Sequence, residues 1–449
     1  MKVVIVGGIA GGMTTAVNFK KLSKDTKIIV FEKNEFISYS ACAMPYFLAG
    51  EINSIEKLIL YTPEQIKTKF SIDVRTNSEV IKINKRQKKV SVIDKINNKE
   101  YEENYDKLVL ATGAKPFIPS IEGITKFRNI FTLRTINDAI AINNYLQNNI
   151  VKKAVIIGAG LIGLEVGEAL IRRGCSVTYI EIKKNLLKIL PDDLSEQLIT
   201  LLKNYNVEIL TETLIEKIDG DDINKKATTI KTNKKDIECD IIILSTGIKA
   251  EIELAKEAGL EINKNYSVIE TNKKQQTSEE MIYAVGDCTN TYNLINNKIT
   301  YIPLATTARK QAAVTANNLI NNNTIFNGML NCWCTRFMDI EIAGVGLSLY
   351  EAENSNFSAK SATYELSSLP DYINRKNDLY INYVWDKKSN RLLGAFLLGY
   401  GGTVYRANIL AASITGRLTM KEISDMDLSY SPIFNTVFDP ITIAAKKSY

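Results

Sequence analysis

The sequence contains one strand–glycine turn–helix–strand pattern twice, at residues 2–31 and 153–180, and this repeat limits the fold more than any other feature. Each copy begins with a short run of apolar, mostly β-branched residues. It continues through a glycine-rich turn into a helical stretch and closes with a second strand that is followed by glutamate. Two parallel strands joined through a helix are the building unit of a doubly wound α/β sheet. The repeat therefore predicts two Rossmann-like domains in one chain.

The second turn has the complete pattern for binding a pyrophosphate. Its glycines are Gly158, Gly160 and Gly163. Glycine lets the backbone approach the phosphates closely, and the free amides of the following helix attract an anion. Glu181 closes the second strand, where a carboxylate accepts hydrogen bonds from a ribose diol and repels a 2′-phosphate. We therefore expect NADH, with NADPH as the alternative because Lys183 and Lys184 follow closely.

The first turn is less regular, because Ile9 stands where the middle glycine is expected. Its glycines are Gly7, Gly8, Gly11 and Gly12. An ordinary βαβ crossover without a ligand is the alternative for this segment. Two further residues favour a flavin nucleotide. Glu32 ends the second strand, and Asp287 follows a later short strand in the position that meets the ribityl–phosphate region in two-nucleotide flavoproteins.

The chain has no histidine, which removes several kinds of catalytic site. A Ser-His-Asp triad, a histidine-ligated metal and a histidine general acid are excluded, and no cysteine spacing indicates a metal site. The formal net charge is +6, with acids and bases mixed along the chain, so we do not expect a nucleic-acid partner. No apolar run approaches the ~20 residues that cross a bilayer, and the N-terminal strand leads into a turn without a cleavage site. We therefore expect a cytoplasmic protein with no membrane span.

Cys42 is the candidate redox residue among six cysteines. It follows the first repeat, and Pro45 and Gly50 are typical of the first turn and the end of a short helix. A thiol near a helix N-terminus has a lowered pKa, which favours the reactive thiolate. The alternative is a cysteine that serves packing. Cys332 and Cys334 are expected to point the same way on one strand.

Taken together, these motifs resemble the pyridine nucleotide–disulfide oxidoreductase superfamily. The resemblance covers nearly the whole chain, including both glycine turns, the cysteine segment, the run Ala111-Thr112-Gly113 and the Gly286-Asp287 segment. The two-cysteine branch spaces its pair as C-x-x-x-x-C, whereas Phe47 stands where the second cysteine would be. The chain therefore resembles the single-cysteine branch, which holds NADH oxidases, NADH peroxidases and coenzyme A disulfide reductases.

Within that branch the chain most resembles the coenzyme A disulfide reductases. Ala10 occupies a position where the oxidases and peroxidases generally have histidine. The segments Cys42–Tyr46 and Ser429–Pro432 resemble the cysteine segment of the reductases and the tyrosine segment that reaches into the partner subunit's site. Phe438 departs from this pattern because lysine is expected there for the coenzyme A phosphates, and Phe70 is a second such position. Basic residues that could compensate are Lys20, Lys21 and Lys69.

The resemblance implies an α/β fold with two Rossmann-like dinucleotide-binding domains, one for FAD and one for NAD, and a C-terminal α+β dimerisation domain. From about Phe326 the sequence itself changes to alternating strands such as Leu379–Val384 and Leu392–Leu398, with a helix near Ala407–Ile414. The expected division is an FAD-binding domain of residues 1–115 and 248–325, an NAD(P)H-binding domain of residues 116–247 and a dimerisation domain of residues 326–449. The resemblance also implies a homodimer, with each active site completed by the partner subunit.

The resemblance also implies an enzyme that uses NAD(P)H and FAD to reduce a small-molecule disulfide. Cys42 would form a mixed disulfide with coenzyme A, which is the expected substrate. Tyr430 and Tyr372 are the candidate catalytic proton donors in the absence of histidine. The expected cofactor-binding residues are Gly7, Gly8, Ala10, Gly11, Gly12, Glu32, Lys33, Val80, Thr112, Gly113, Arg134, Gly158, Gly160, Leu161, Ile162, Gly163, Glu165, Glu181, Gly247, Asp287, Leu304, Ala305 and Thr306. The expected substrate-binding residues are Thr14, Asn18, Lys21, Ser38, Ala41, Lys69 and Tyr372.

Three other functions stay open at this point. An NADH oxidase or peroxidase would cycle Cys42 through a sulfenic acid. A persulfide or polysulfide reductase would use the same thiolate on a sulfane sulfur. A flavin-containing electron-transfer or redox-sensing protein belongs to a different class, and the long charged docking tracts that would suit it are absent from the sequence.

Overall fold

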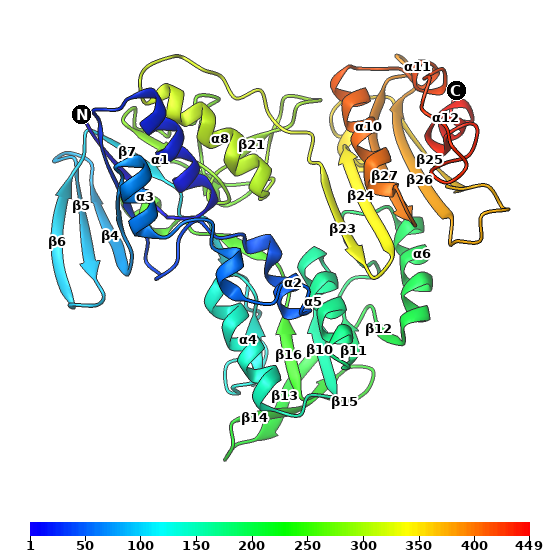
Figure 1. Cartoon of the computed structure of the whole chain (residues 1–449), viewed down its shortest axis with the longest axis horizontal. Helices are drawn as coiled ribbons and strands as arrows, with labels where there is room; N and C mark the ends of the chain where they lie inside the picture. The colour runs from blue at the N-terminus through cyan, green and yellow to red at the C-terminus, as the bar shows by residue number, and fades with distance from the viewer.

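The computed structural model describes residues 1–449, and its first sheet is the parallel sheet predicted from the N-terminal repeat. Five parallel strands lie in the order β20-β7-β1-β2-β3. Their bounds are β1 (Lys2–Val6), β2 (Lys27–Phe31), β3 (Asp73–Arg75), β7 (Lys107–Leu110) and β20 (Ile282–Ala284). Helices α1 (Ala10–Leu22) and α8 (Ala305–Asn318) pack together against one face (Figure 1). The strands consist of continuous apolar runs because helices or hairpins cover both faces.

The second sheet repeats this arrangement with strands in the order β12-β11-β10-β16-β9, all parallel. Its strands are β9 (Ile130–Thr132), β10 (Lys153–Ile157), β11 (Ser176–Ile180), β12 (Val207–Leu210) and β16 (Ile241–Leu244). Its helices are α4 (Ile136–Asn148), α5 (Leu161–Arg172) and α6 (Asp192–Leu202), followed by the 3-10 turn η3 (Lys203–Tyr205). The strands and helices predicted from both repeats are therefore confirmed to within a residue.

Smaller antiparallel sheets extend the two α/β units. The three-stranded ones are β4 (Ser78–Asn84) with β5 (Lys89–Asp94) and β6 (Lys99–Asn104), and β13 (Ile215–Asp221) with β14 (Lys226–Thr232) and β15 (Ile237–Glu238). The two-stranded ones are β8 (Ala114–Pro116) with β17 (Ile248–Ala250), β18 (Ile262–Asn263) with β19 (Val268–Ile269), and β21 (Thr291–Tyr292) with β22 (Ile299–Thr300). The short helical elements are η1 (Ala41–Ala43), α2 (Met44–Leu48), η2 (Ile55–Leu58), α3 (Pro63–Phe70) and α7 (Glu253–Glu257). The β8–β17 pair lies where the chain passes into and out of the second unit.

The C-terminal part is an antiparallel sheet in the order β23-β24-β27-β26-β25, packed with helices as an α+β domain. Its strands are β23 (Trp333–Phe337), β24 (Ile340–Gly346), β25 (Ala359–Ser367), β26 (Asp378–Asp386) and β27 (Leu392–Gly399). Its helices are α9 (Leu349–Glu353), α10 (Thr403–Thr415), α11 (Met420–Ser424) and α12 (Pro440–Lys446). The predicted fold class is thus confirmed, and the domain boundaries stay a prediction.

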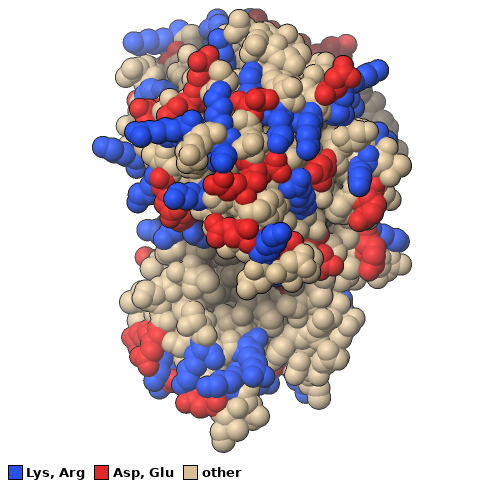
Figure 2. All heavy atoms as spheres, turned by 90° about the vertical axis from the view of Figure 1, so that its left-hand side faces the viewer, with Lys and Arg blue, Asp and Glu red and all other residues tan.

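The face of the molecule in Figure 2 carries lysine, arginine, aspartate and glutamate interspersed over the first α/β unit. Below this region the surface is hollowed, and the walls of the hollow are mainly other residues. This face therefore presents no field of a single sign. None of the helices combines the length and the apolar character needed to cross a bilayer.

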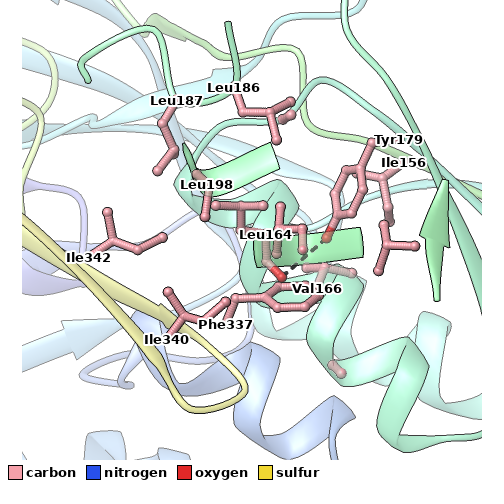
Figure 3. Packing of buried hydrophobic residues seen from close by; sticks show 14 of the residues in the cluster. Ile156, Leu164, Val166, Tyr179, Leu186, Leu187, Leu198, Phe337, Ile340 and Ile342 are labelled. Carbon is pink, nitrogen blue, oxygen red and sulfur yellow. Dashed lines mark hydrogen bonds between the residues drawn. The ribbon is translucent and has the colours of Figure 1, made fainter. Parts of the chain in front are cut away.

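The C-terminal domain is fixed to the second α/β unit by a shared hydrophobic core. Ile340 and Ile342 reach from the β23–β24 hairpin toward Leu164 of α5 and Leu198 of α6 (Figure 3). Phe337 is fully buried in this core and meets the ring of Tyr205 edge-on at 5.8 Å. Since α5 starts at the second glycine turn, this core fixes edge strand β23 relative to that turn.

We expect Phe337→Ala to lower the free energy of unfolding by about 3–5 kcal/mol, because it leaves a cavity in the core between the two domains. Urea denaturation measures the change. Tyr350→Ala is the matched control, since Tyr350 is an exposed aromatic residue of the same domain. Equal stability of the two variants would show that this contact does not hold the domains together.

Candidate functional site

Both glycine turns bring the backbone into closer contact than a side chain permits. Gly7 has φ +109°, and a Cβ atom there would lie 2.2 Å from the carbonyl oxygen of Ala111. Gly158 has φ +95°, and its Cβ would lie 2.4 Å from the carbonyl oxygen of Ser245. In each unit, the turn after the first strand is therefore held against the segment that follows a neighbouring parallel strand.

The acid at the end of the second strand makes the same two contacts in both units. Glu32 accepts hydrogen bonds from the backbone N–H of Gly8 at 2.8 Å and of Asn34 at 2.9 Å. Glu181 accepts them from Ala159 at 3.0 Å and Lys183 at 2.9 Å. Each carboxylate thus ties its strand end to the adjacent glycine turn.

The turns fit the phosphates of a dinucleotide. Helices α1 and α5 begin without a capping side chain and without an acidic residue in the first turn, so their free amides are available to an anion. A Cβ atom on Gly160 would meet no atom within 4 Å, which shows that the outer side of the second turn is open. Lys184 pairs with Glu196 at 2.9 Å, so one of the two lysines that would favour a 2′-phosphate is already engaged.

Cys42 lies in the 3-10 turn η1, directly before α2. Pro45 stands in the first turn of α2, and Gly50 beyond its end has φ +81°, as the sequence predicted. The Cys42 thiol is free and exposed. Cys332 and Cys334 are also exposed, while the other three cysteines are buried.

The predicted lowering of the Cys42 pKa is wrong for the protein chain. Partial burial raises the pKa of the thiol above its ordinary value, Glu165 and Asp287 raise it further, and Arg134 opposes them. Helix α2 has only five residues, so its dipole is weak beside these effects. The neutral thiol is therefore favoured in this surrounding.

Arg134 and Asp287 form an ion pair between the two nucleotide-binding units. The guanidinium Nη2 lies 2.8 Å from Oδ2 of Asp287, and Nε donates to the carbonyl oxygen of Ala114 at 3.0 Å. Thr112 donates to the carbonyl oxygen of Glu251 at 2.6 Å. These contacts gather residues from the predicted cofactor set beside the β8–β17 pair.

Glu165 of α5 contacts the C-terminal domain, which the sequence did not indicate. Thr335 of β23 donates a hydrogen bond from Oγ1 to Oε1 of Glu165 at 2.9 Å. The neighbouring Arg336 lies 2.6 Å from Oε1 of Glu51. No motif marks Thr335 or Arg336, and these partners lie 170 and 285 residues away in the sequence.

Tyr430 lies beside Tyr372 and raises the pKa of the Tyr372 phenol. Both are exposed. The loop that carries Tyr372, between β25 and β26, projects away from α2 in Figure 1. One chain therefore does not bring the two tyrosines to Cys42.

The predicted substrate residues lie on two surfaces. Thr14, Asn18 and Lys21 are spaced along one face of α1. Lys69 donates to Tyr61 Oη at 3.1 Å, beside an open pocket of about 490 Å³. Leu60 lines this pocket. The backbone of Leu58 and Leu60 hydrogen-bonds to the backbone of Ser40 and Ser38, which joins the pocket to the segment that precedes Cys42.

The other predicted cofactor residues are distributed over several elements. Lys33 follows Glu32, Val80 lies in β4 of an antiparallel sheet, and Gly113 and Gly247 follow strands β7 and β16. Leu304, Ala305 and Thr306 form the N-terminus of α8, while Ala10, Leu161 and Ile162 belong to the first turns of α1 and α5.

Two family profiles match the chain. Residues 1–312 match the profile described as pyridine nucleotide-disulphide oxidoreductase, and residues 334–440 match the dimerisation domain of the same group. A relative from Methanocaldococcus jannaschii named NADH oxidase is 34% identical over 447 residues, covering 99% of this chain and 98% of the relative. A Pyrococcus abyssi relative named NAD(P)H sulfur oxidoreductase (CoA-dependent) is 35% identical and covers 99% of this chain and 97% of its own.

Two further comparisons concern enzymes of coenzyme A. A coenzyme A disulfide reductase from Staphylococcus epidermidis is 30% identical over 449 residues, covering 100% of this chain and 99% of the relative. The crystal structure of reduced Bacillus anthracis CoADR-RHD matches with a TM-score of 0.94 at 31% identity, covering 99% of this chain and 79% of that one.

The raised pKa of Cys42 predicts slow alkylation near neutral pH. In the reduced protein, the iodoacetamide rate at Cys42 should reach half its maximum at a higher pH than that of free cysteine measured in parallel. Glu165→Gln should move this midpoint to lower pH, because it removes a negative charge that disfavours the thiolate. Peptide mass spectrometry follows Cys42 alone. Glu257→Gln, at an exposed position, is the control, and a midpoint unmoved by Glu165→Gln would contradict the assignment.

Proposed function

The chain belongs to the pyridine nucleotide-disulphide oxidoreductase family, and we propose that it reduces coenzyme A disulfide with NADH through FAD and Cys42. The coarser activity, an NAD(P)H-dependent flavoprotein oxidoreductase, follows from the family itself. One observation carries the finer proposal. Cys42 is an exposed thiol under the influence of Glu165, Asp287 and Arg134, and Phe47 stands where a second redox cysteine would be.

Each glycine turn is proposed to bind one dinucleotide. In the first unit, Gly8 and Glu32 would face the FAD phosphates and ribose, and Asp287 the ribityl–phosphate region. In the second unit, Gly160 would face the NADH phosphates and Glu181 the ribose diol. When bound, the flavin accepts a hydride from the nicotinamide and returns an electron pair to a disulfide.

Cys42 performs the thiol chemistry. Its thiolate attacks one sulfur of the incoming disulfide, a mixed disulfide forms, and the other half leaves as a thiolate that takes a proton. Two electrons that originate from NADH then cleave the mixed disulfide, which returns the Cys42 thiolate and a second thiol. The balance is one NADH and one proton consumed for each disulfide and two thiols released.

The departing thiolate needs a proton donor, and the chain has no histidine to supply it. Tyr430 of the partner subunit is the proposed donor, with the partner subunit's Tyr372 in support. A phenol of pKa about 10 can protonate an alkyl thiolate. Residues 334–440 match a dimerisation domain, and the exposure of both tyrosines in one chain supports their use across a dimer interface.

Coenzyme A is supported as the thiol by the surface around Lys69, which the backbone hydrogen bonds of Leu58 and Leu60 join to the segment that precedes Cys42. Lys69 lies 5.1 Å from the ring centre of Tyr61 and 5.4 Å from that of Phe70, which puts a cation and two aromatic rings beside the open pocket. An adenine nucleotide offers a π surface and phosphates to such a group. Two relatives are named for coenzyme A, which agrees with this choice.

A persulfide or sulfur acceptor is the second candidate. The Pyrococcus abyssi relative is named as a CoA-dependent sulfur oxidoreductase, so a thiol carried on Cys42 and reduction of sulfane sulfur are compatible in a similar chain. Oxygen or peroxide is the third, because the Methanocaldococcus jannaschii relative is named NADH oxidase.

We expect the purified protein to oxidise NADH faster with coenzyme A disulfide than with peroxide or polysulfide, measured without oxygen, and faster with NADH than with NADPH. Mass spectrometry should find coenzyme A attached to Cys42. Cys42→Ser should lower disulfide turnover by at least about 1,000-fold, since it removes the nucleophile. Cys334→Ser, which removes another exposed thiol, is the control. Full turnover by Cys42→Ser would contradict the proposal, and preference for polysulfide or peroxide would replace its substrate.

Tyr430→Phe tests the proton donor separately. Turnover of coenzyme A disulfide should fall by about 100-fold, because a positioned acid contributes about that much or more. Reduction of the flavin by NADH should keep its rate, because that half-reaction comes before thiol release. Tyr405→Phe changes another exposed tyrosine of the same domain and serves as the control. Unchanged turnover in Tyr430→Phe would remove the donor role.

A further inference from the structure

Thr335 and Arg336 are adjacent residues on β23, the edge strand of the C-terminal sheet. Successive side chains of a strand point to opposite faces. Thr335 is buried with its neighbours Trp333 and Phe337, whereas Arg336 is partly exposed. The two residues therefore reach different partners although they share one peptide bond.

Thr335 holds Glu165, the carboxylate that we expect beside the nicotinamide. Its hydroxyl donates to Oε1 of Glu165 at 2.9 Å. Burial raises the pKa of Glu165, and this hydrogen bond opposes the rise. A hydroxyl that donates to the carboxylate fixes its rotamer and supports its charged form.

Arg336 holds the helix that follows the redox cysteine. Its Nη2 lies 2.6 Å from Oε1 of Glu51, just beyond α2, and its guanidinium lies 5.7 Å from the ring centre of Tyr46 within α2. The same guanidinium lies 3.6 Å from Oε1 of Glu168 on α5. Arg336 thus joins residues of three domains.

A small cavity connects the two sets of contacts. It measures about 10 Å³, and Tyr46, Glu51, Glu165, Glu168 and Arg336 all line it. The Nε atom of Arg336 is buried without a hydrogen-bond partner. The space corresponds to roughly one water molecule.

We propose that Thr335 and Arg336 are a positioning pair through which the dimerisation domain fixes Glu165 and helix α2, which follows Cys42, relative to each other. This rests on the proposed use of Cys42 and NADH. The pair itself does not react. Thr335 sets the acid for the hydride step, and Arg336 sets the thiol for the disulfide step, so the larger effect of each residue falls on one half-reaction.

If the bonds of Thr335 and Arg336 only stabilised the fold, their loss would affect both half-reactions or neither. Arg172 provides the matched control. Arg172 pairs with Glu168 at 2.8 Å within α5 and lies 3.7 Å from Glu51, so it shares the carboxylates of Arg336. Its ion pairs are with Glu168 and Glu51, and neither of these residues lies on β23. Arg172→Met therefore removes a similar charge without releasing α2 from the C-terminal domain.

The test measures two anaerobic single-turnover rates on the flavin-loaded dimer. One is reduction of the flavin by NADH, and the other is cleavage of coenzyme A disulfide by the reduced enzyme. Thr335→Val should slow the first by about tenfold and leave the second within about twofold. Arg336→Met should slow the second by about tenfold and leave the first within about twofold. Thr335→Ser should restore the first rate, because it keeps the hydroxyl.

The outcomes separate the possible roles. Equal losses in both rates, or losses matched by Arg172→Met, would overturn the positioning role in favour of general stability, which thermal unfolding of each variant monitors. Unchanged rates in both variants would overturn it as well. A wild-type enzyme that cleaves no disulfide would contradict the proposed function, yet the NADH rate would still test Thr335.

Discussion

The charges of two carboxylates and one guanidinium, which come from different parts of the chain, shift the pKa of a single thiol. Burial, Glu165 and Asp287 disfavour the Cys42 anion, while Arg134 supports it and is itself paired with Asp287. The protein alone thus favours a sulfur without charge. In a mixed disulfide the sulfur of Cys42 carries no charge, so the surroundings that disfavour the free thiolate do not disfavour this covalent form in the same way. The proposed chemistry depends on this balance.

The fold creates this balance by bringing strand ends together. Both α/β units hold a glycine turn against the segment after a parallel strand and tie it to a glutamate, at Glu32 and Glu181. Ligands bind at this edge of open α/β sheets because helix N-termini and strand ends converge there. The C-terminal sheet adds residues from a third direction through β23, which is packed on α5 by the core around Phe337. Helix α2, which follows Cys42, is then held from more than one side.

How far the sequence predicted this arrangement depended on the range of the interactions. Strands β1, β2, β10 and β11 were predicted because apolar runs and glycine turns are local patterns. The direction of the Cys42 pKa shift was predicted wrongly, because local helix position was the only signal, whereas Glu165 and Asp287 come from distant segments. Thr335 and Arg336 were not predicted, since a lone hydroxyl and a lone guanidinium on a strand carry no motif until the tertiary contacts are known.

The pairing of β8 with β17 has a consequence for how such a chain can evolve. Ala114 lies opposite Ala250, so the chain leaves the first unit and returns to it at neighbouring points. A segment whose two ends are adjacent can be replaced as a block while the remainder keeps its packing. Replacing the second α/β unit at the β8–β17 pair could therefore change which nicotinamide nucleotide is used. The first α/β unit, which would hold the flavin, could be inherited unchanged.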